Sequence, residues 1–208
     1  PQVKQVLRVA ATLAARRRGG MTVVTKPAGM PTISDLWRDV AQQEAQHAGV
    51  DLTVMEIDYA SYQLFQNPRQ FDVLVTANMF GDILSDIGGV LLGSRGLCFG
   101  GSFATNGAAV FQTNHGAAFD LAGTDRANPV GQLYSLAMML REHFELAAEA
   151  DLIGRAVADI WRAGWCTDDL ASAGRRAIGT QAFAQRVAEA VAEAGEAPFP
   201  EAAQARSV

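Results

Sequence analysis

The sequence lacks several features that would assign it to a common class of protein. Its 208 residues contain only two cysteines, Cys98 and Cys166, and these have no CxxC spacing, so neither a disulfide framework nor a zinc site is indicated. No apolar run approaches the roughly 20 residues that cross a bilayer, and the N-terminus has no signal-peptide pattern. The formal net charge of -5 argues against a nucleic-acid partner held through its phosphates. These absences predict a cytoplasmic protein with no membrane or nucleic-acid partner.

The sequence also lacks a starting methionine. It opens with Pro1, directly before apolar residues that recur at helical spacing over residues 3–13, and we expect the natural start to lie upstream. What is present is enough apolar sequence for a core, because 49% of the residues are hydrophobic and only 19% are charged.

The order of predicted elements in the first part of the chain is typical of an α/β protein. Strands and helices alternate there, as expected for a layered α/β structure. The predicted strands cover residues 21–25, 52–57 and 71–76, and the predicted helices cover residues 33–48, 59–65 and 78–92.

A change in amino-acid composition at residue 93 predicts a domain boundary. The glycine-rich stretch over residues 93–107 indicates a long loop or a domain crossing, so we expect one domain over residues 1–93 and a second over 94–208. The second domain is predicted to contain a strand over 109–112, helices over 129–143, 147–163 and 181–194, and a frayed tail.

Two aspartates stand four residues apart in the predicted helix NMFGDILSDIGG. Asp82 and Asp86 would then lie on one helix face, about 6 Å apart. They are either two solvated acids or the two sides of a bound cation. Asp58 and Lys26 each stand at the end of a predicted strand, where α/β proteins place ligand groups. Together these residues could form an oxygen-lined divalent-metal site beside an acid–base group.

A second group of candidate residues lies in the polar loop over residues 114–129. It combines a planar ring, a carboxylate, an amide and flexible backbone, which could hold a nucleotide, although polar glycine-rich loops are also common without one. The candidates are His115, Gly116, Asp120, Gly123 and Asn128.

These residues occur in motifs that resemble those of the isocitrate and 3-isopropylmalate dehydrogenase family. The motifs follow the family's order over nearly the whole chain: TK at 25–26, ID at 57–58, NPRQFDVLVTANMFGDILSD at 67–86, GS at 93–94, HGAAFDLAG at 115–123 and ANP at 127–129. The resemblance implies an isopropylmalate-dehydrogenase-like two-domain fold. This chain would carry part of the small domain and the C-terminal part of the large domain.

The resemblance also implies a metal-dependent, decarboxylating oxidation of a 2-hydroxy dicarboxylic acid in a homodimer with a shared active site. Asp82 and Asp86 of one subunit would bind Mg2+ or Mn2+ together with Asp58 of the other subunit. Lys26 and Asp58 would act on the substrate's hydroxyl proton.

For the cofactor, the resemblance implies NAD. His115 and Asn128 resemble the family's adenine contacts, with Gly116 in the same loop, and no GxGxxG fingerprint is present. Asp120 stands where NAD-using members carry an acid, which can accept hydrogen bonds from the ribose hydroxyls and repels a 2'-phosphate.

Three positions depart from the family pattern. Ala28 replaces a usual asparagine, Gln112 a common glutamate and Phe119 a usual proline. The alternatives to an active dehydrogenase are therefore a catalytically silent paralogue or regulatory subunit, and a metal-binding or scaffold protein that reuses the fold. The family's substrate-binding arginines and catalytic tyrosine would lie upstream, so we expect the 208 residues alone to bind NAD weakly and to turn over no substrate.

Overall fold

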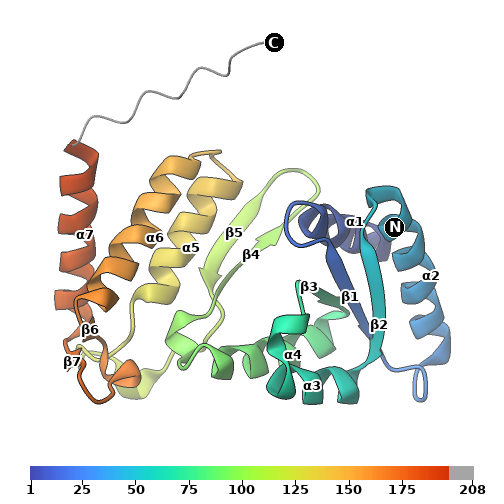
Figure 1. Ribbon diagram of the computed structural model, residues 1–208, viewed down its shortest axis with the longest axis horizontal. Helices are drawn as coiled ribbons and strands as arrows, with labels where there is room; N and C mark the ends of the chain where they lie inside the picture. The colour runs from blue at the N-terminus through green and yellow to red at the C-terminus, as the bar shows by residue number, and fades with distance from the viewer. Residues whose placement is uncertain (197–208) are drawn as a thin grey trace, which may run out of the picture. The chain divides into compact units, whose positions relative to one another are not determined.

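The computed structural model describes residues 1–196 and divides into two compact units (Figure 1). The first unit is Pro1–Leu91 and the second begins at Leu92, close to the glycine-rich stretch that starts at Gly93. Each unit has its own hydrophobic core. The predicted frayed tail lies outside the described residues.

The first unit is built on a parallel three-stranded sheet. Its strands are β1 (Gly20–Thr25), β2 (Asp51–Glu56) and β3 (Val73–Thr76), in the order β2-β1-β3. These are the three strands that the alternating pattern predicted. The α/β fold class is thereby confirmed.

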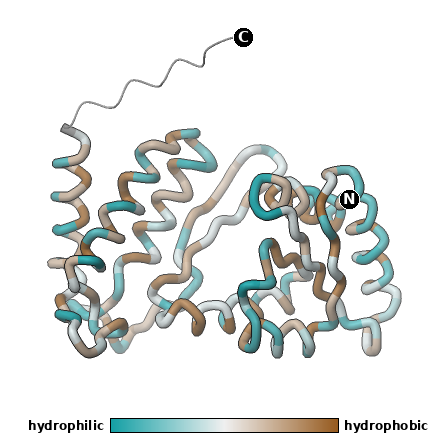
Figure 2. Tube along the Cα trace, in the orientation of Figure 1, coloured by the Kyte–Doolittle hydropathy of each residue, from teal (hydrophilic) through white to brown (hydrophobic). Residues whose placement is uncertain are grey.

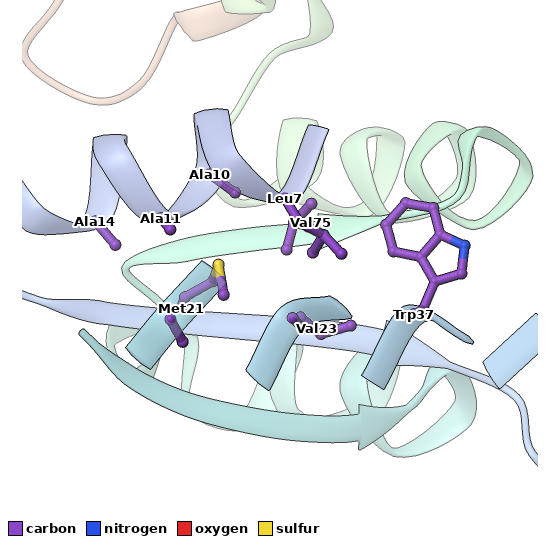
Figure 3. Packing of buried hydrophobic residues seen from close by; sticks show 10 residues of the cluster. Leu7, Ala10, Ala11, Ala14, Met21, Val23, Trp37 and Val75 are labelled. Carbon is purple, nitrogen blue, oxygen red and sulfur yellow. The ribbon is translucent and has the colours of Figure 1, made fainter. Parts of the chain in front are cut away.

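Helices cover both faces of this sheet. On one face, α1 (Gln2–Ala15) and α2 (Pro31–Ala48) pack against Met21, Val23 and Val75 (Figure 3). On the other face, α3 (Ile57–Gln66) and α4 (Asn78–Leu91) pack around Val24. Neighbouring residues of β1 thus serve opposite cores, as strand geometry requires. A 3-10 turn, η1 (Pro68–Gln70), joins α3 to β3.

A buried carboxylate ties α1 to the start of β3. Asp72 keeps only 4% of its side chain exposed and lies 2.9 Å from the Arg17 guanidinium. Its other oxygen accepts hydrogen bonds from the backbone N–H groups of Arg18, at 2.9 Å, and Gly20, at 3.3 Å. Arg17 and Arg18, which follow α1, therefore have a structural partner, and Gly19 turns the chain there with a φ of 85°.

The second unit combines a hairpin with three helices. The antiparallel strands β4 (Phe99–Phe103) and β5 (Ala109–Thr113) pack against α5 (Val130–Glu142), which is followed by α6 (Ala147–Arg162) and α7 (Thr180–Glu196). Hydrophilic and hydrophobic residues alternate along these helices (Figure 2), as expected for helices with one buried face. Short elements complete the unit: η2 (Arg95–Leu97), η3 (Phe119–Leu121), β6 (Trp165–Cys166), η4 (Asp168–Leu170) and β7 (Arg176–Ala177).

Two expectations about local structure were wrong. The predicted loop over residues 93–107 contains β4. Glycines in this strand leave space for neighbouring side chains: a Cβ on Gly100 would lie 2.8 Å from the Asn114 side chain, and one on Gly101 would lie 3.0 Å from the Phe103 ring. Asp58 does not end a strand, because β2 stops at Glu56 and α3 already begins at Ile57. An acid in the first turn of a helix is favoured by the helix dipole.

Among residues 1–196, none of the helices combines the length and the apolar character needed to cross a membrane.

We predict that Asp72→Asn lowers the melting temperature by several degrees at pH 7. The substitution leaves Arg17 without its counter-ion. It also replaces the charged carboxylate, which accepts from two backbone N–H groups, with a neutral amide. The hydrogen bond from Arg17 outweighs the opposing effect of burial and lowers the pKa of Asp72 in the folded protein. Its stabilisation is therefore present above the unfolded pKa and is lost as the pH falls through the folded pKa.

Thermal unfolding followed by circular dichroism at pH 7 and pH 3 measures this effect. The difference in melting temperature between wild type and variant should be largest at pH 7 and should shrink below about pH 4. Asp35→Asn is the matched control, because the Asp35 carboxylate is 54% exposed in its pair with Arg38 and should contribute little. Equal melting temperatures for wild type and Asp72→Asn at pH 7 would contradict the prediction.

Candidate functional site

The register of the parallel sheet brings the predicted acid–base residues to one edge. Thr25, the last residue of β1, lies opposite Glu56, the last residue of β2. The chain leaves both strands at the carboxyl edge of the sheet, which is where open α/β sheets bind ligands. Lys26 and Asp58 follow these strand ends and therefore meet.

Lys26 is held by two carboxylates. Its ammonium group donates hydrogen bonds to Glu56 Oε2 at 2.9 Å and to Asp58 Oδ2 at 3.1 Å. Its backbone N–H donates to the buried Ser34 hydroxyl at 3.2 Å, which fixes the start of the loop between β1 and α2. The structure therefore brings Lys26 and Asp58 together. It adds Glu56, which the sequence reasoning missed.

The two carboxylates favour the charged form of the lysine. Hydrogen bonding to Glu56 and then to Asp58 raises the pKa of Lys26. The hydrogen bond from Lys26, and then backbone donors at the start of α3, lower the pKa of Asp58. At neutral pH the cluster is thus an ammonium between two carboxylates.

The two aspartates of α4 lie one helical turn apart and are both exposed. Apolar side chains on the same helix are exposed as well: 60% of Met79, 52% of Ile83 and 63% of Val90. Within residues 1–196 of a single chain, no three acidic, histidine or cysteine side chains are grouped so that they could hold a metal ion. The site predicted from Asp82, Asp86 and a second subunit's Asp58 therefore stays a prediction.

Three of the predicted nucleotide contacts line one cavity of the second unit. The cavity measures about 390 Å³, within the range of small-molecule sites. His115, Gly116 and Asn128 line it, with Ser94, Arg126 and Asp169 among their neighbours. Asp120 is not among the lining residues. It lies in η3, exposed, between the lining residues Ala118 and Leu121. Gly123 lines an adjacent cavity of about 370 Å³.

Hydrogen bonds orient two polar side chains in this wall. The Asn128 amide oxygen accepts from the backbone N–H of Val130 at 3.0 Å, at the start of α5. The His115 Nδ1 lies 2.9 Å from the Gly116 carbonyl oxygen. Because a carbonyl oxygen only accepts, this contact requires a proton on Nδ1, and in the neutral ring Nε2 is then an acceptor.

The three departures from the family pattern are all at exposed positions. Ala28 lies in the turn between β1 and α2, two residues after Lys26. Gln112 lies in β5 opposite Gly100. Phe119 is 87% exposed at the start of η3, next to Asp120. None of them interrupts the lysine–carboxylate cluster.

Comparison with known proteins points to one family. Residues 1–187 match the family model described as isocitrate/isopropylmalate dehydrogenase. Among curated proteins, the 3-isopropylmalate dehydrogenases of Nitratidesulfovibrio vulgaris and Geobacillus kaustophilus are each 41% identical to this chain over 191 residues. These alignments cover 91% of this chain but only 53% and 51% of the relatives. The chain thus spans about half the length of the curated relatives that it matches.

Solved structures give the same result. The isocitrate dehydrogenase of Methylococcus capsulatus superposes with a TM-score of 0.84 at 35% identity, over 91% of this chain and 56% of that one. A beta-decarboxylating dehydrogenase of Thermococcus kodakarensis superposes with a TM-score of 0.78 at 30% identity, over 92% of this chain and 55% of that one.

We predict that Glu56→Gln makes Lys26 more reactive toward an amine-specific acylating reagent. The substitution removes the largest influence that raises the pKa of Lys26, so a larger fraction of the amine is neutral and nucleophilic. The labelling rate at pH 9 should rise several-fold, as measured by mass spectrometry of the two lysine peptides.

The sequence supplies an internal control, because its only other lysine is Lys4. Lys4 lies 3.6 Å from Glu44 and makes no contact with the cluster, so its labelling rate should not change. A Lys26 rate equal to that of the wild type would show that Glu56 does not hold the ammonium.

Proposed function

Because this chain belongs to the isocitrate/isopropylmalate dehydrogenase family, we propose that the protein catalyses the NAD-dependent, metal-assisted oxidative decarboxylation of a 2-hydroxy dicarboxylic acid resembling 3-isopropylmalate. The observation that carries this proposal is the contact of Lys26 with Asp58, at 3.1 Å, on the carboxyl edge of a parallel sheet. Two residues that sequence separates by more than thirty positions meet there as an acid–base pair.

The donor chemistry of α4 fits a divalent metal. Asp82 and Asp86 offer carboxylate oxygens from one helix face, and hard cations such as Mg2+ and Mn2+ prefer oxygen ligands. Asp58 keeps 69% of its side-chain surface exposed and can serve a site that a second subunit completes. When bound, a divalent cation supplies Lewis acidity that polarises substrate oxygens and stabilises developing negative charge.

The lysine–carboxylate cluster supplies the proton chemistry. Lys26 is an ammonium in the resting state, because its pKa is raised. To accept the substrate's hydroxyl proton, it must first pass a proton to a neighbouring oxygen, and Asp58 Oδ2 lies 3.1 Å away. Asp58 is exposed and can exchange that proton with water. As an ammonium, Lys26 can also donate a proton after decarboxylation.

The cavity of the second unit is where we place the adenosine part of NAD. His115, Gly116 and Asn128 line it, and its His115 Nε2 acceptor suits the exocyclic amine of adenine. Asp120, on the adjacent η3, would accept from the ribose hydroxyls. A carboxylate there favours NAD over NADP, because the extra phosphate of NADP would meet like charge.

Dimerisation through α4 is part of the same proposal. A site that needs the Asp58 of a second subunit is incomplete in one chain. The exposed Met79, Ile83 and Val90 give this helix an apolar surface suited to a second copy.

Ala28 favours a second candidate, a catalytically silent member of the family. The family's usual asparagine offers an amide two residues after the lysine, and alanine offers none. The lysine–carboxylate cluster itself is complete, which is why we place the active enzyme first.

We predict that Asp82→Asn weakens Mn2+ binding by the full-length protein by at least about tenfold, because a carboxylate ligand becomes a neutral amide. Isothermal titration with MnCl2, without substrate or cofactor, measures this. Asp35→Asn removes an exposed carboxylate of α2 and is the control for the loss of one negative charge. Equal Mn2+ affinities for Asp82→Asn and wild type would remove Asp82 from the metal site.

We predict that the full-length protein with Mn2+ reduces NAD when given 3-isopropylmalate, at a rate on the order of 1 per second or more. Isocitrate, tartrate and malate should be tested beside it by the absorbance of NADH at 340 nm. NADP should be at least about tenfold poorer in kcat/KM, and Asp120→Lys should narrow that preference.

The outcomes of this assay separate the candidates. Turnover of none of the acids by a folded, Mn2+-binding protein would favour the silent paralogue. A wild type that uses NADP better than NAD would show that the role given to Asp120 is wrong.

A further inference from the structure

We propose that Asp169 is a positioning residue of the nucleotide cavity. Its carboxylate holds the Asn128 amide in the orientation that binds the cofactor. This inference rests on the proposed function, because it takes the cavity to be the adenosine site. It adds a residue that neither the motifs nor the polar loop pointed to.

The Asp169 carboxylate joins three separate segments of the second unit. It accepts hydrogen bonds from Asn128 Nδ2 at 3.0 Å, from Thr167 Oγ1 at 2.6 Å and from the Ser94 hydroxyl. Ser94 precedes η2, Asn128 precedes α5, and Thr167 follows β6. Ser94, Asn128 and Asp169 all line the cavity, whereas Thr167 is buried and is not part of the lining.

These bonds fix which way the Asn128 amide points. Its oxygen accepts from the Val130 N–H and its nitrogen donates to Asp169. If the amide rotated by 180°, its oxygen would face a carboxylate and its NH2 group would face a backbone donor, so both hydrogen bonds would be lost. One N–H and one oxygen lone pair of the amide are then left for a ligand.

The charge state of Asp169 supports this role. Burial works against ionisation, but the hydrogen bonds from Ser94, Thr167 and Asn128 outweigh it and lower the pKa of Asp169. The carboxylate is therefore ionised at neutral pH and acts only as an acceptor, which is what excludes the rotated amide.

A fixed amide binds a nucleotide more tightly than a mobile one. Ordering a polar side chain on binding costs about 0.5–1.5 kcal/mol, which corresponds to about two- to tenfold in affinity. Asp169 and its partners have already ordered Asn128 in the protein without ligand. Loss of Asp169 should therefore lower the nucleotide affinity, and this loss should occur only when Asn128 is present.

A double-mutant cycle tests this coupling. The full-length protein and its variants Asp169→Ala, Asn128→Ala and Asp169→Ala/Asn128→Ala are titrated calorimetrically with 5'-AMP and with NAD. We expect Asp169→Ala to weaken both by about two- to tenfold, and the double variant to be no weaker than Asn128→Ala. Asp169→Asn should restore most of the affinity, because its carbonyl oxygen can face Asn128 while its NH2 group faces the Thr167 hydroxyl, which can accept.

Two further variants separate positioning from loss of fold. Asp159→Ala breaks an ion pair with Arg162 on α6, outside the cavity lining, and should leave AMP affinity unchanged. Thr167→Val removes one hydrogen bond to Asp169 without altering Asn128, and should give a smaller loss in the same direction. It also keeps the inference testable if Asp169→Ala does not fold at the assay temperature.

Wild-type affinity in folded Asp169→Ala, or losses that multiply in the double variant, would overturn the role of Asp169 and leave the proposed function standing. A wild type that binds neither AMP nor NAD would instead overturn the proposed function, and this inference with it.

Discussion

The parallel pairing of β1 with β2 is the constraint on which the candidate active site depends. Thr25 lies opposite Glu56, so the residues that follow both strands emerge together and Lys26 reaches two carboxylates. The register is held by packing on both faces of β1, because Val23 packs against α1 and α2 while Val24 packs against α3 and α4. A slip of one residue would turn Val23 and Val24 toward the opposite helices and disrupt both cores. The position of Lys26 beside Glu56 and Asp58 therefore depends on the packing of the central strand, β1.

In the second unit, close backbone contacts position the polar loop that carries the cavity-lining residues. A Cβ on Gly131 would lie 2.7 Å from the Gly96 carbonyl oxygen, so only glycine lets α5 approach η2 this closely. Six residues before Gly131, Asp125 accepts from the Gln181 N–H at 2.8 Å and anchors the loop to the start of α7. The C-terminal part of the polar loop is thus fixed to both α5 and α7.

The sequence was informative where function depends on residue type and local spacing. The strand–helix alternation, the carboxylates of α4 and the histidine and asparagine of the loop could all be recognised from short patterns. Glu56 and Asp169 could not, because each acts through a partner far along the chain: Lys26 is 30 positions from Glu56, and Asn128 is 41 positions from Asp169. The only available signal for Glu56 was an acid at the carboxyl end of a predicted strand, two residues before Asp58. Strand β4 was missed for another reason, since its glycines make room for neighbouring side chains and local propensity counts them against a strand.

The exposed face of α4 links the proposed metal site to the proposed dimer. Exposed apolar side chains and two exposed carboxylates lie together on this helix. A second copy that covered Met79, Ile83 and Val90 would also remove Asp82 and Asp86 from water, at a cost of several kcal/mol for any charge that the interface left uncompensated. Burial of the three apolar side chains, at about 1.5–3 kcal/mol each, is of similar size to this cost and leaves little net stabilisation. Under our proposal a divalent cation offsets the two charges, so assembly through α4 and metal binding should favour each other.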